Sequence, residues 1–285
     1  MKSKKLLLSL LMLGSISLTS CYVDLGFIQI GEKEEEKKEE KEGEQQTEPN
    51  YKTIPQEEID AYYASISDET GESLKSALRR IIDTSDVAVS YGWARYEKAD
   101  EDPFNSKNVV LIYARTSVKK TAHVNSQGIG WNREHTFPQS KLDDDQAKSD
   151  NHIIFASDAV VNATRSNYKL GVVSGGSAII DSYNQTTTCR LGSNLFDPNN
   201  EARGIVARAT MYAAAMYGYD PTDNFDSLAT MLKWNLQYPV TKFDESRNNK
   251  VYQVQKNRNP FVDHPEYACK IWGTKNSATK AACGL

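Results

Sequence analysis

The residues best suited to chemistry lie in the stretch 131–167, which holds two of the chain's four histidines. His135 directly follows Glu134, and His152 stands two residues after Asp150. Imidazole and carboxylate groups can transfer protons, and carboxylate oxygens can also bind a cation. We therefore expect the chemistry of the protein to be concentrated in this stretch.

The local structure decides whether Glu134 and His135 can act together. The run from Trp131 to His135 predicts a short strand that ends before Pro138. Neighbouring residues of a regular strand point to opposite faces. Both side chains can therefore serve one site only where the strand bends or ends, and Pro138 favours such an ending.

A helix is predicted next, capped by Ser157 or Asp158 and running to residue 167. On it, Asn162 lies three residues from Arg165, so one face presents an amide and a guanidinium together. Asn is a poor residue for a helix interior, so its presence there calls for an explanation, and a functional role is one. The simpler alternative is an exposed asparagine that costs the helix little stability.

The remaining patterns predict an α+β domain in which helix dominates. The β-branched and aromatic run NVVLIYAR predicts a buried strand over 108–115, and a further strand is expected over 152–155. Apolar residues recur at helical spacing in several other segments. These predicted helices cover 68–86, 203–217, 226–238, 251–257 and 264–272, before a polar tail.

Residues 1–20 have the composition of an export signal. Lysines precede an apolar run over 6–18, which is too short to span a bilayer and is typical of a secretory signal peptide. The run ends in the letters LTSC, which resemble the lipobox of bacterial lipoproteins. The resemblance implies that Cys21 is lipidated and becomes the first residue. A cysteine that lies near the cleavage site of an exported protein by chance is the alternative.

The segment after Cys21 is strongly polar. From Glu32 to Glu48 it has nine Glu and four Lys and almost nothing apolar, so it cannot bury enough surface to fold. We expect residues 21–50 to be a disordered tether and residues 51–285 to be the folded domain. The whole chain has a net charge of −4, and this tether carries most of the acidic excess. The domain itself is therefore almost neutral.

A near-neutral domain gives no overall electrostatic sign of a polyanionic partner, so any such site must be a local patch. With 39% hydrophobic residues the chain can bury a core, and no second change of composition divides 51–285. Gly171 to Ser177 lacks the P-loop pattern, and the G-x-S-x-G element of serine hydrolases is absent from the sequence.

Three cysteines remain in the expected domain: Cys189, Cys269 and Cys283. In an exported protein, a bridge from Cys269 to Cys283 would leave Cys189 free, and the two other pairings stay open. The spacing matches no metal cluster, so we assign these thiols no catalytic role.

The run WNREHTFPQS, from Trp131 to Ser140, resembles the NREH signature of the bacterial endonuclease I family. The blocks DNH at 150–152 and VNATRSNY at 161–168 resemble two further motifs of that family, in the same order. Weaker similarity extends the resemblance to about residues 70–272. Several spaced motifs agree, which is more specific than a match to one pattern.

This resemblance implies a His-Me finger, or ββα-metal, core of two short strands and a helix around one divalent metal ion. It implies that Glu134 and Asn162 are the metal ligands and that His135 is the general base. One carboxylate and one amide oxygen suit Mg²⁺, which keeps several waters, although Mn²⁺ or Ca²⁺ are alternatives. The family pattern further implies products with 5′-phosphate and 3′-hydroxyl ends.

Other residues of the matched blocks are assigned supporting roles. Arg165 is a candidate for catalysis by phosphate contact, with a structural ion pair to Asp158 or Asp150 as the alternative. For Asp150 and His152 we favour orientation of the site or hydrogen bonding in the core. The candidates for substrate binding are Arg133, Arg165, Asn167 and Lys169.

One departure from the family pattern concerns the loop 136–149. Some members have a longer loop here with an arginine that contacts phosphate, whereas this loop has no arginine and carries the acidic run Asp143, Asp144 and Asp145. If these carboxylates faced the substrate, binding would be weak and sensitive to salt. The phosphate contact must then come from elsewhere.

These features together predict a monomeric endonuclease of low sequence specificity that is anchored through Cys21. It would act on DNA, with RNA as a further substrate, at the extracellular face of the membrane or facing a periplasm. A non-catalytic lipoprotein that binds nucleic acid or a host surface is the competing hypothesis. An extracellular ribonuclease is the narrower alternative.

Overall fold

The computed structural model describes residues 48–84 and 90–285, and every structural statement below concerns these residues. The expected signal peptide, Cys21 and nearly all of the expected tether lie outside them. None of the helices within the described ranges is both long enough and apolar enough to cross a membrane.

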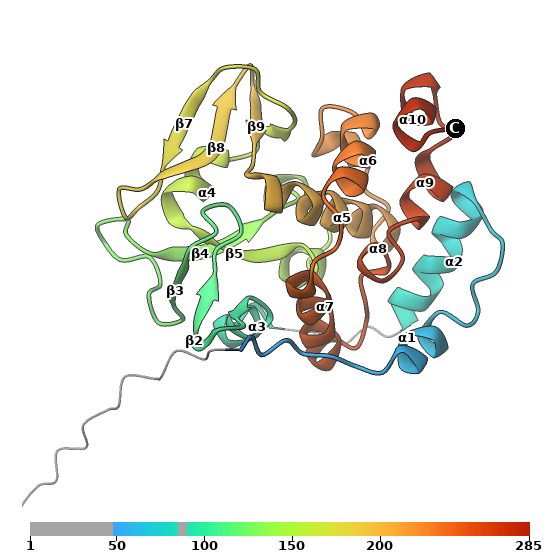
Figure 1. The fold of residues 1–285 in the computed structure, drawn as a ribbon, viewed down its shortest axis with the longest axis horizontal. Coiled ribbons are helices and arrows are strands. Elements are labelled where there is room, and N and C mark those ends of the chain that lie inside the picture. Colours follow the sequence, from blue (N-terminus) through green and yellow to red (C-terminus); the bar gives the residue numbers. More distant parts are fainter. Residues whose placement is uncertain (1–47, 85–89) are drawn as a thin grey trace, which may run out of the picture. The chain divides into compact units, whose positions relative to one another are not determined.

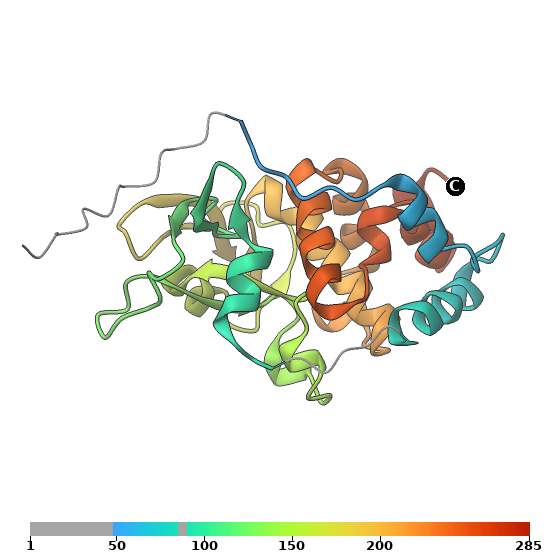
Figure 2. The ribbon, with the colours of Figure 1, turned by 90° about the horizontal axis from the view of Figure 1, so that it is seen from below.

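The fold has a β-rich half and a helical half, which Figure 1 shows side by side and which stay distinct in the turned view of Figure 2. At the centre of the β-rich half, β4 (Trp131–His135) pairs antiparallel with β5 (Ile154–Asp158). Helix α4 (Ala159–Arg165) follows β5 without a loop, because Asp158 ends the strand and caps the helix. The predicted strand-strand-helix order is therefore present, with β5 starting two residues later than expected.

Two small sheets surround this unit. β1 (Glu101–Asp102), β2 (Asn105–Val110) and β3 (Ser117–Lys119) form one antiparallel sheet. The other has the order β6-β9-β8-β7, which sequence reasoning missed. Its strands are β6 (Lys169–Leu170), β7 (Ser177–Ile180), β8 (Thr186–Gly192) and β9 (Leu195–Asp197). Gly175 and Gly176, at positive φ of 81° and 76°, bend the chain just before β7.

The predicted strand over 108–115 is only partly correct. β2 ends at Val110, and Leu111 to Tyr113 continue as a fully buried turn. Arg115 closes this turn at a positive φ of 55°, with its backbone N–H donating to the Leu111 carbonyl at 2.9 Å. A buried apolar run thus resembles a strand in sequence although the backbone reverses there.

The helical half packs around α5 (Asn200–Met216), which is buried along almost its whole length. Its run of alanines and methionines lets neighbouring helices approach from several sides, so it is the core of this half. The other helices of this half are α1 (Gln56–Tyr62), α2 (Gly71–Thr84), α6 (Leu228–Gln237), α7 (Lys242–Gln255), α8 (Pro260–Asp263), α9 (Tyr267–Trp272) and α10 (Ser277–Cys283). Helix α3 (Trp93–Ala99) instead packs on β2 and β5 of the β-rich half and on α7.

Helix α7 begins at Lys242, nine residues before the predicted segment 251–257. The capping box of Thr241 and Asp244 starts it. Its buried face is polar: Arg247 pairs with Asp100 at 2.6 Å, and Asp244 pairs with Arg208 at 3.0 Å. Hydrophobic periodicity could not detect a helix whose buried positions carry paired charges.

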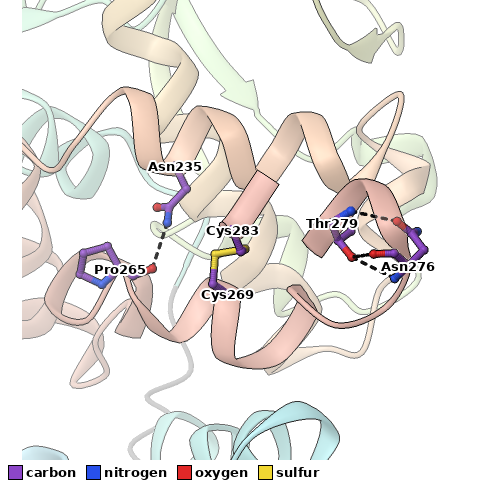
Figure 3. The surroundings of a disulfide bond; sticks show 6 residues. All are labelled: Asn235, Pro265, Cys269, Asn276, Thr279 and Cys283. Atoms are coloured by element: carbon purple, nitrogen blue, oxygen red, sulfur yellow. Dashed lines mark hydrogen bonds between the residues drawn. A yellow bond between two sulfur atoms is a disulfide. The ribbon is translucent and has the colours of Figure 1, made fainter. Parts of the chain in front are cut away.

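The tail after residue 272, expected to be polar, contains helix α10. Asn276 and Thr279 form its capping box, and the disulfide between Cys269 and Cys283 ties its end to α9 (Figure 3). This pairing is the first of the three that the sequence left open. Cys189 is free and buried, as that pairing requires.

We predict that replacing Cys269 and Cys283 with alanine lowers the free energy of unfolding by about 3 kcal/mol, because the bridge closes a short loop in the unfolded chain. Urea denaturation of the purified protein measures this loss. Wild type in a reducing agent should unfold at the same urea concentration as the double variant. An unchanged midpoint in both cases would contradict a stabilising role.

Candidate active site

Strand β4 holds its functional residues at an open edge. Ala156 and Ile154 of β5 are opposite Arg133 and His135, and their own backbone groups bond away from β4. The carbonyls of Arg133 and His135 correspondingly point away from β5, where they accept hydrogen bonds from α4. Arg165 on α4 contacts both neighbours, the carbonyl of His135 at 3.3 Å and the carboxylate of Glu134 at 3.5 Å, so both residues lie against the same helix.

His135 is buried, with 7% of its surface exposed. Its Nε2 lies 3.1 Å from the carbonyl oxygen of Lys148. A carbonyl only accepts, so Nε2 carries the hydrogen and Nδ1 is left as the acceptor nitrogen. Burial lowers the pKa of His135, and the nearby Arg133 and Arg165 lower it further against the opposing effect of the Lys148 carbonyl. The ring is therefore neutral at pH 7 and can accept a proton.

Glu134 is more deeply buried, at 2% exposure. Its Oε1 accepts a hydrogen bond of 2.8 Å from the hydroxyl of Tyr113 and lies 3.5 Å from Nε of Arg165. The second contact is an ion pair without a hydrogen bond. Burial raises the pKa of Glu134 to about 7, although the Arg165 charge and the Tyr113 hydrogen bond both lower it. A cation at the carboxylate would favour the ionised form.

Asn162 is held beside the same strand. Its Nδ2 donates to Oδ1 of Asn132 at 2.7 Å and to the carbonyl of Arg133 at 3.2 Å. Asn132 and Glu134 stand two residues apart and so share a face of β4. The structure thus brings Asn162 to the strand residues around Glu134, with its amide nitrogen engaged.

The donor atoms of this pair fit a hard cation. Within the described ranges, no group donates a hydrogen bond to Oε2 of Glu134 or to Oδ1 of Asn162. Two oxygen donors that leave room for water suit Mg²⁺. No three His, Cys, Asp or Glu side chains among the described residues gather in a metal-binding cluster. The expected set of one carboxylate and one amide is smaller than such a cluster.

The structure corrects the prediction that Arg165 contacts a phosphate. Its side chain is 1% exposed. Nη1 donates to the carbonyls of His135 and Ser166, at 3.3 and 3.0 Å, and Nη2 donates to the Thr136 carbonyl and to Oδ1 of Asn224, at 2.8 and 2.7 Å. The alternative partners Asp158 and Asp150 are also wrong, since the ion pair is with Glu134. Arg165 is a buried positioning residue.

Asp150 and His152 lie in a separate buried network. Asp150 accepts hydrogen bonds from the hydroxyls of Tyr212 and Tyr217, at 2.8 and 2.7 Å. Nε2 of His152 lies 3.1 Å from the Asn257 carbonyl, and burial lowers the pKa of His152 to about 4. Both residues thus tie the loop before β5 to the helical half, in the core hydrogen-bonding role that the sequence favoured.

Arg133 is the cation closest to His135 in the strand, and it sits between two aromatic rings. Its Cζ lies 3.6 Å from the ring centre of Tyr91 and 4.0 Å from that of Trp93. Nη1 donates to the Tyr91 carbonyl at 2.9 Å. Among the described residues, nothing accepts a hydrogen bond from its Nε or Nη2. These donors stay available for a phosphate.

Asn167 and Lys169 are exposed and hydrogen-bond to none of the described site residues, so their role in substrate binding stays a prediction. Sequence reasoning missed the supporting residues Tyr113, Tyr91 and Asn132. Tyr113 lies inside the apolar run for which the sequence predicts a strand. No local sequence pattern marks Tyr91 or Asn132 as site residues.

We predict that Glu134 makes stability fall with pH in the absence of metal. The pKa of Glu134 in the folded state, about 7, is above its value in the unfolded chain. The contribution of Glu134 to the free energy of unfolding is therefore full below about pH 4 and is lost as the pH rises through 7. In EDTA, the difference in unfolding free energy between wild type and Glu134→Gln should therefore decrease by about 1 to 3 kcal/mol from pH 5 to pH 8. Urea titrations at both pH values measure it, and a constant difference would contradict the raised pKa.

Comparison with known proteins agrees with this site. Residues 70–266 match the family model of endonuclease I. An extracellular ribonuclease of Bacillus amyloliquefaciens is 36% identical over 76% of this chain and 80% of its own length. One from Bacillus subtilis is 34% identical over the same shares. A periplasmic deoxyribonuclease of Aeromonas hydrophila is 27% identical over 41% of this chain and 48% of its own length. The chain belongs to the endonuclease I family and is an enzyme that hydrolyses nucleic acid.

Proposed function

We propose that this protein is an exported, metal-dependent endonuclease that cuts RNA and DNA without sequence specificity, with His135 as general base. The observation that carries the proposal is the hydrogen bond from Nε2 of His135 to the Lys148 carbonyl. It fixes the ring and leaves Nδ1 as the nitrogen that can accept a proton. A non-catalytic lipoprotein, the competing hypothesis, would need no such base.

In the proposed reaction, Nδ1 of His135 removes a proton from a water molecule, and that water attacks the phosphorus of a phosphodiester. The bond from phosphorus to the 3′ oxygen breaks, and that oxygen takes a proton from a water molecule. The products carry 5′-phosphate and 3′-hydroxyl ends, and His135 returns its proton to solvent. Because burial lowers the pKa of His135, the base is ready at neutral pH and is lost only under acidic conditions.

Glu134 and Asn162 are the proposed ligands of one Mg²⁺, with Mn²⁺ or Ca²⁺ as alternatives. A divalent ion held there would supply charge stabilisation to the phosphate oxygens. The residues of the chain orient it: Tyr113 and Arg165 fix the Glu134 carboxylate, and Asn132 fixes the Asn162 amide. On this basis we assign β4, β5 and α4 to a His-Me finger core.

We propose RNA as the preferred substrate and DNA as the second. The sequence alone put DNA first. The two ribonuclease-named relatives match over about twice the share of the chain that the deoxyribonuclease-named relative does, which favours RNA. Cleavage of plasmid and of RNA by the same preparation compares the two.

We further propose export and lipid anchoring at Cys21, with residues 21–50 as the tether and a monomeric domain beyond it. The composition of residues 1–20 and the lipobox-like letters LTSC support this. The extracellular and periplasmic names of the relatives are consistent with export.

We predict that His135→Ala lowers kcat on RNA and plasmid by about 10²- to 10⁴-fold, because the general base is lost. The assay uses the purified protein with Mg²⁺, Mn²⁺ or Ca²⁺, and EDTA should abolish cleavage. His264→Gln, a histidine outside the site, is the control and should keep activity. A wild type that is inactive with every metal would refute the proposed function.

We predict that Arg133→Gln weakens binding of nucleic acid and reduces the slope of log affinity against log salt by about one, because one phosphate contact is lost. Titration of labelled RNA in EDTA at several salt concentrations measures both quantities. The control is Arg190→Gln, an exposed arginine on β8. An equal effect of the two substitutions would argue against a specific phosphate contact at Arg133.

A further inference from the structure

Tyr91 lies over two functional residues of β4. Its ring centre is 3.6 Å from Cζ of Arg133 and 5.9 Å from the ring centre of His135, with the Tyr91 and His135 planes inclined by 25°. Arg133 and His135 stand two residues apart and project from the same face of the strand. One aromatic ring thus covers both the proposed phosphate contact and the proposed base.

The ring is nevertheless unusually open to solvent. Tyr91 is 42% exposed, whereas most large apolar side chains of the described residues are buried. Arg133 and His135 approach the ring from β4, and the Tyr96 ring meets it edge-on with ring centres 5.8 Å apart. We take the side that faces away from these three groups to be the accessible one. A ring that only closed the core over His135 would not need this exposure.

Tyr91 also ends a stack of flat groups. Arg133 lies between Tyr91 and Trp93, and Trp93 stacks on His123 with ring centres 3.9 Å apart. Nε2 of His123 lies 3.0 Å from Oε1 of Glu97, which holds the far end of the stack. The guanidinium and the rings support one another, so the outermost ring is held in place before any ligand arrives.

We propose that the accessible side of Tyr91 binds a nucleobase next to the scissile phosphate, a subsite that takes unpaired nucleotides. The inference rests on the proposed function and names the substrate class of the same site. A base gains from stacking on an aromatic ring whatever its identity, which agrees with low sequence specificity. The bases of a duplex already stack on one another and cannot lie on Tyr91 unless they unpair. Single-stranded stretches are therefore the favoured substrate.

Binding in EDTA tests the subsite without cleavage. The probes are a labelled single-stranded RNA octamer, the same octamer in a duplex, and a strand of equal length made of abasic nucleotides. Tyr91→Leu should weaken binding of the single strand by about tenfold more than it weakens binding of the duplex or of the abasic strand. Tyr91→Phe, which keeps the ring, should bind like wild type. Phe104→Leu is the matched control, because Phe104 is 41% exposed and lies elsewhere.

The outcomes separate the subsite from other roles of Tyr91. If Tyr91 only supports Arg133, Tyr91→Leu will weaken binding of all three probes by the same factor, which overturns the proposal. Equal binding of the single strand by wild type and Tyr91→Leu also overturns it. If the wild type cleaves RNA but lacks this dependence, only the subsite fails. If the wild type cleaves nothing with any metal, the proposed function fails, while the binding measurement still decides the subsite.

Discussion

The active-site region depends on one buried cation, the guanidinium of Arg165. A charge removed from water is costly unless it is paired and fully hydrogen-bonded. Here the cost is offset by four oxygen acceptors and by the Glu134 carboxylate at 3.5 Å. These partners belong to the end of β4, to the segment after α4 and to Asn224. One side chain therefore fixes the end of the strand against the helix that carries Asn162.

Hydrogen bonds of Tyr113 connect the helical half to the candidate site. The cap of α5, Asn199, donates from Nδ2 to the carbonyl of Tyr113 at 2.6 Å, and Tyr113 in turn donates its hydroxyl to Glu134 at 2.8 Å. At β5, Arg247 of α7 pairs with Asp100 and donates to the Ile154 carbonyl at 2.6 Å. The central helix and α7 thus both hold the strand pair, so the position of the site depends on packing across both halves.

The sequence could predict what depends on neighbours along the chain. β4, the Asp158 cap, α4 and the adjacency of Glu134 and His135 follow from local pattern, and the motif order identified the family. The role of Arg165 could not be predicted, because its acceptors are carbonyl groups whose direction depends on the pairing of β4 with β5. The start of helix α7 was not predicted for a related reason: charged residues that pair across the fold occupy its buried face. Tyr91 is separated from Arg133 by some forty residues, and only the folded chain stacks them.

The acidic run in the loop after β4, which is unfavourable beside a polyanion, has a structural use. Oδ1 of Asp144 accepts hydrogen bonds from the backbone of Gln146 and Ala147, at 2.7 and 3.3 Å, and Asp145 pairs with Lys148 at 2.8 Å. These contacts shape the turn that presents the Lys148 carbonyl to Nε2 of His135. The Asp144 carboxylate therefore acts through the backbone: it holds the loop that selects the His135 tautomer. In the proposed function the phosphate contact is left to Arg133, on the strand itself, where its aromatic neighbours rather than opposite charges hold it in place.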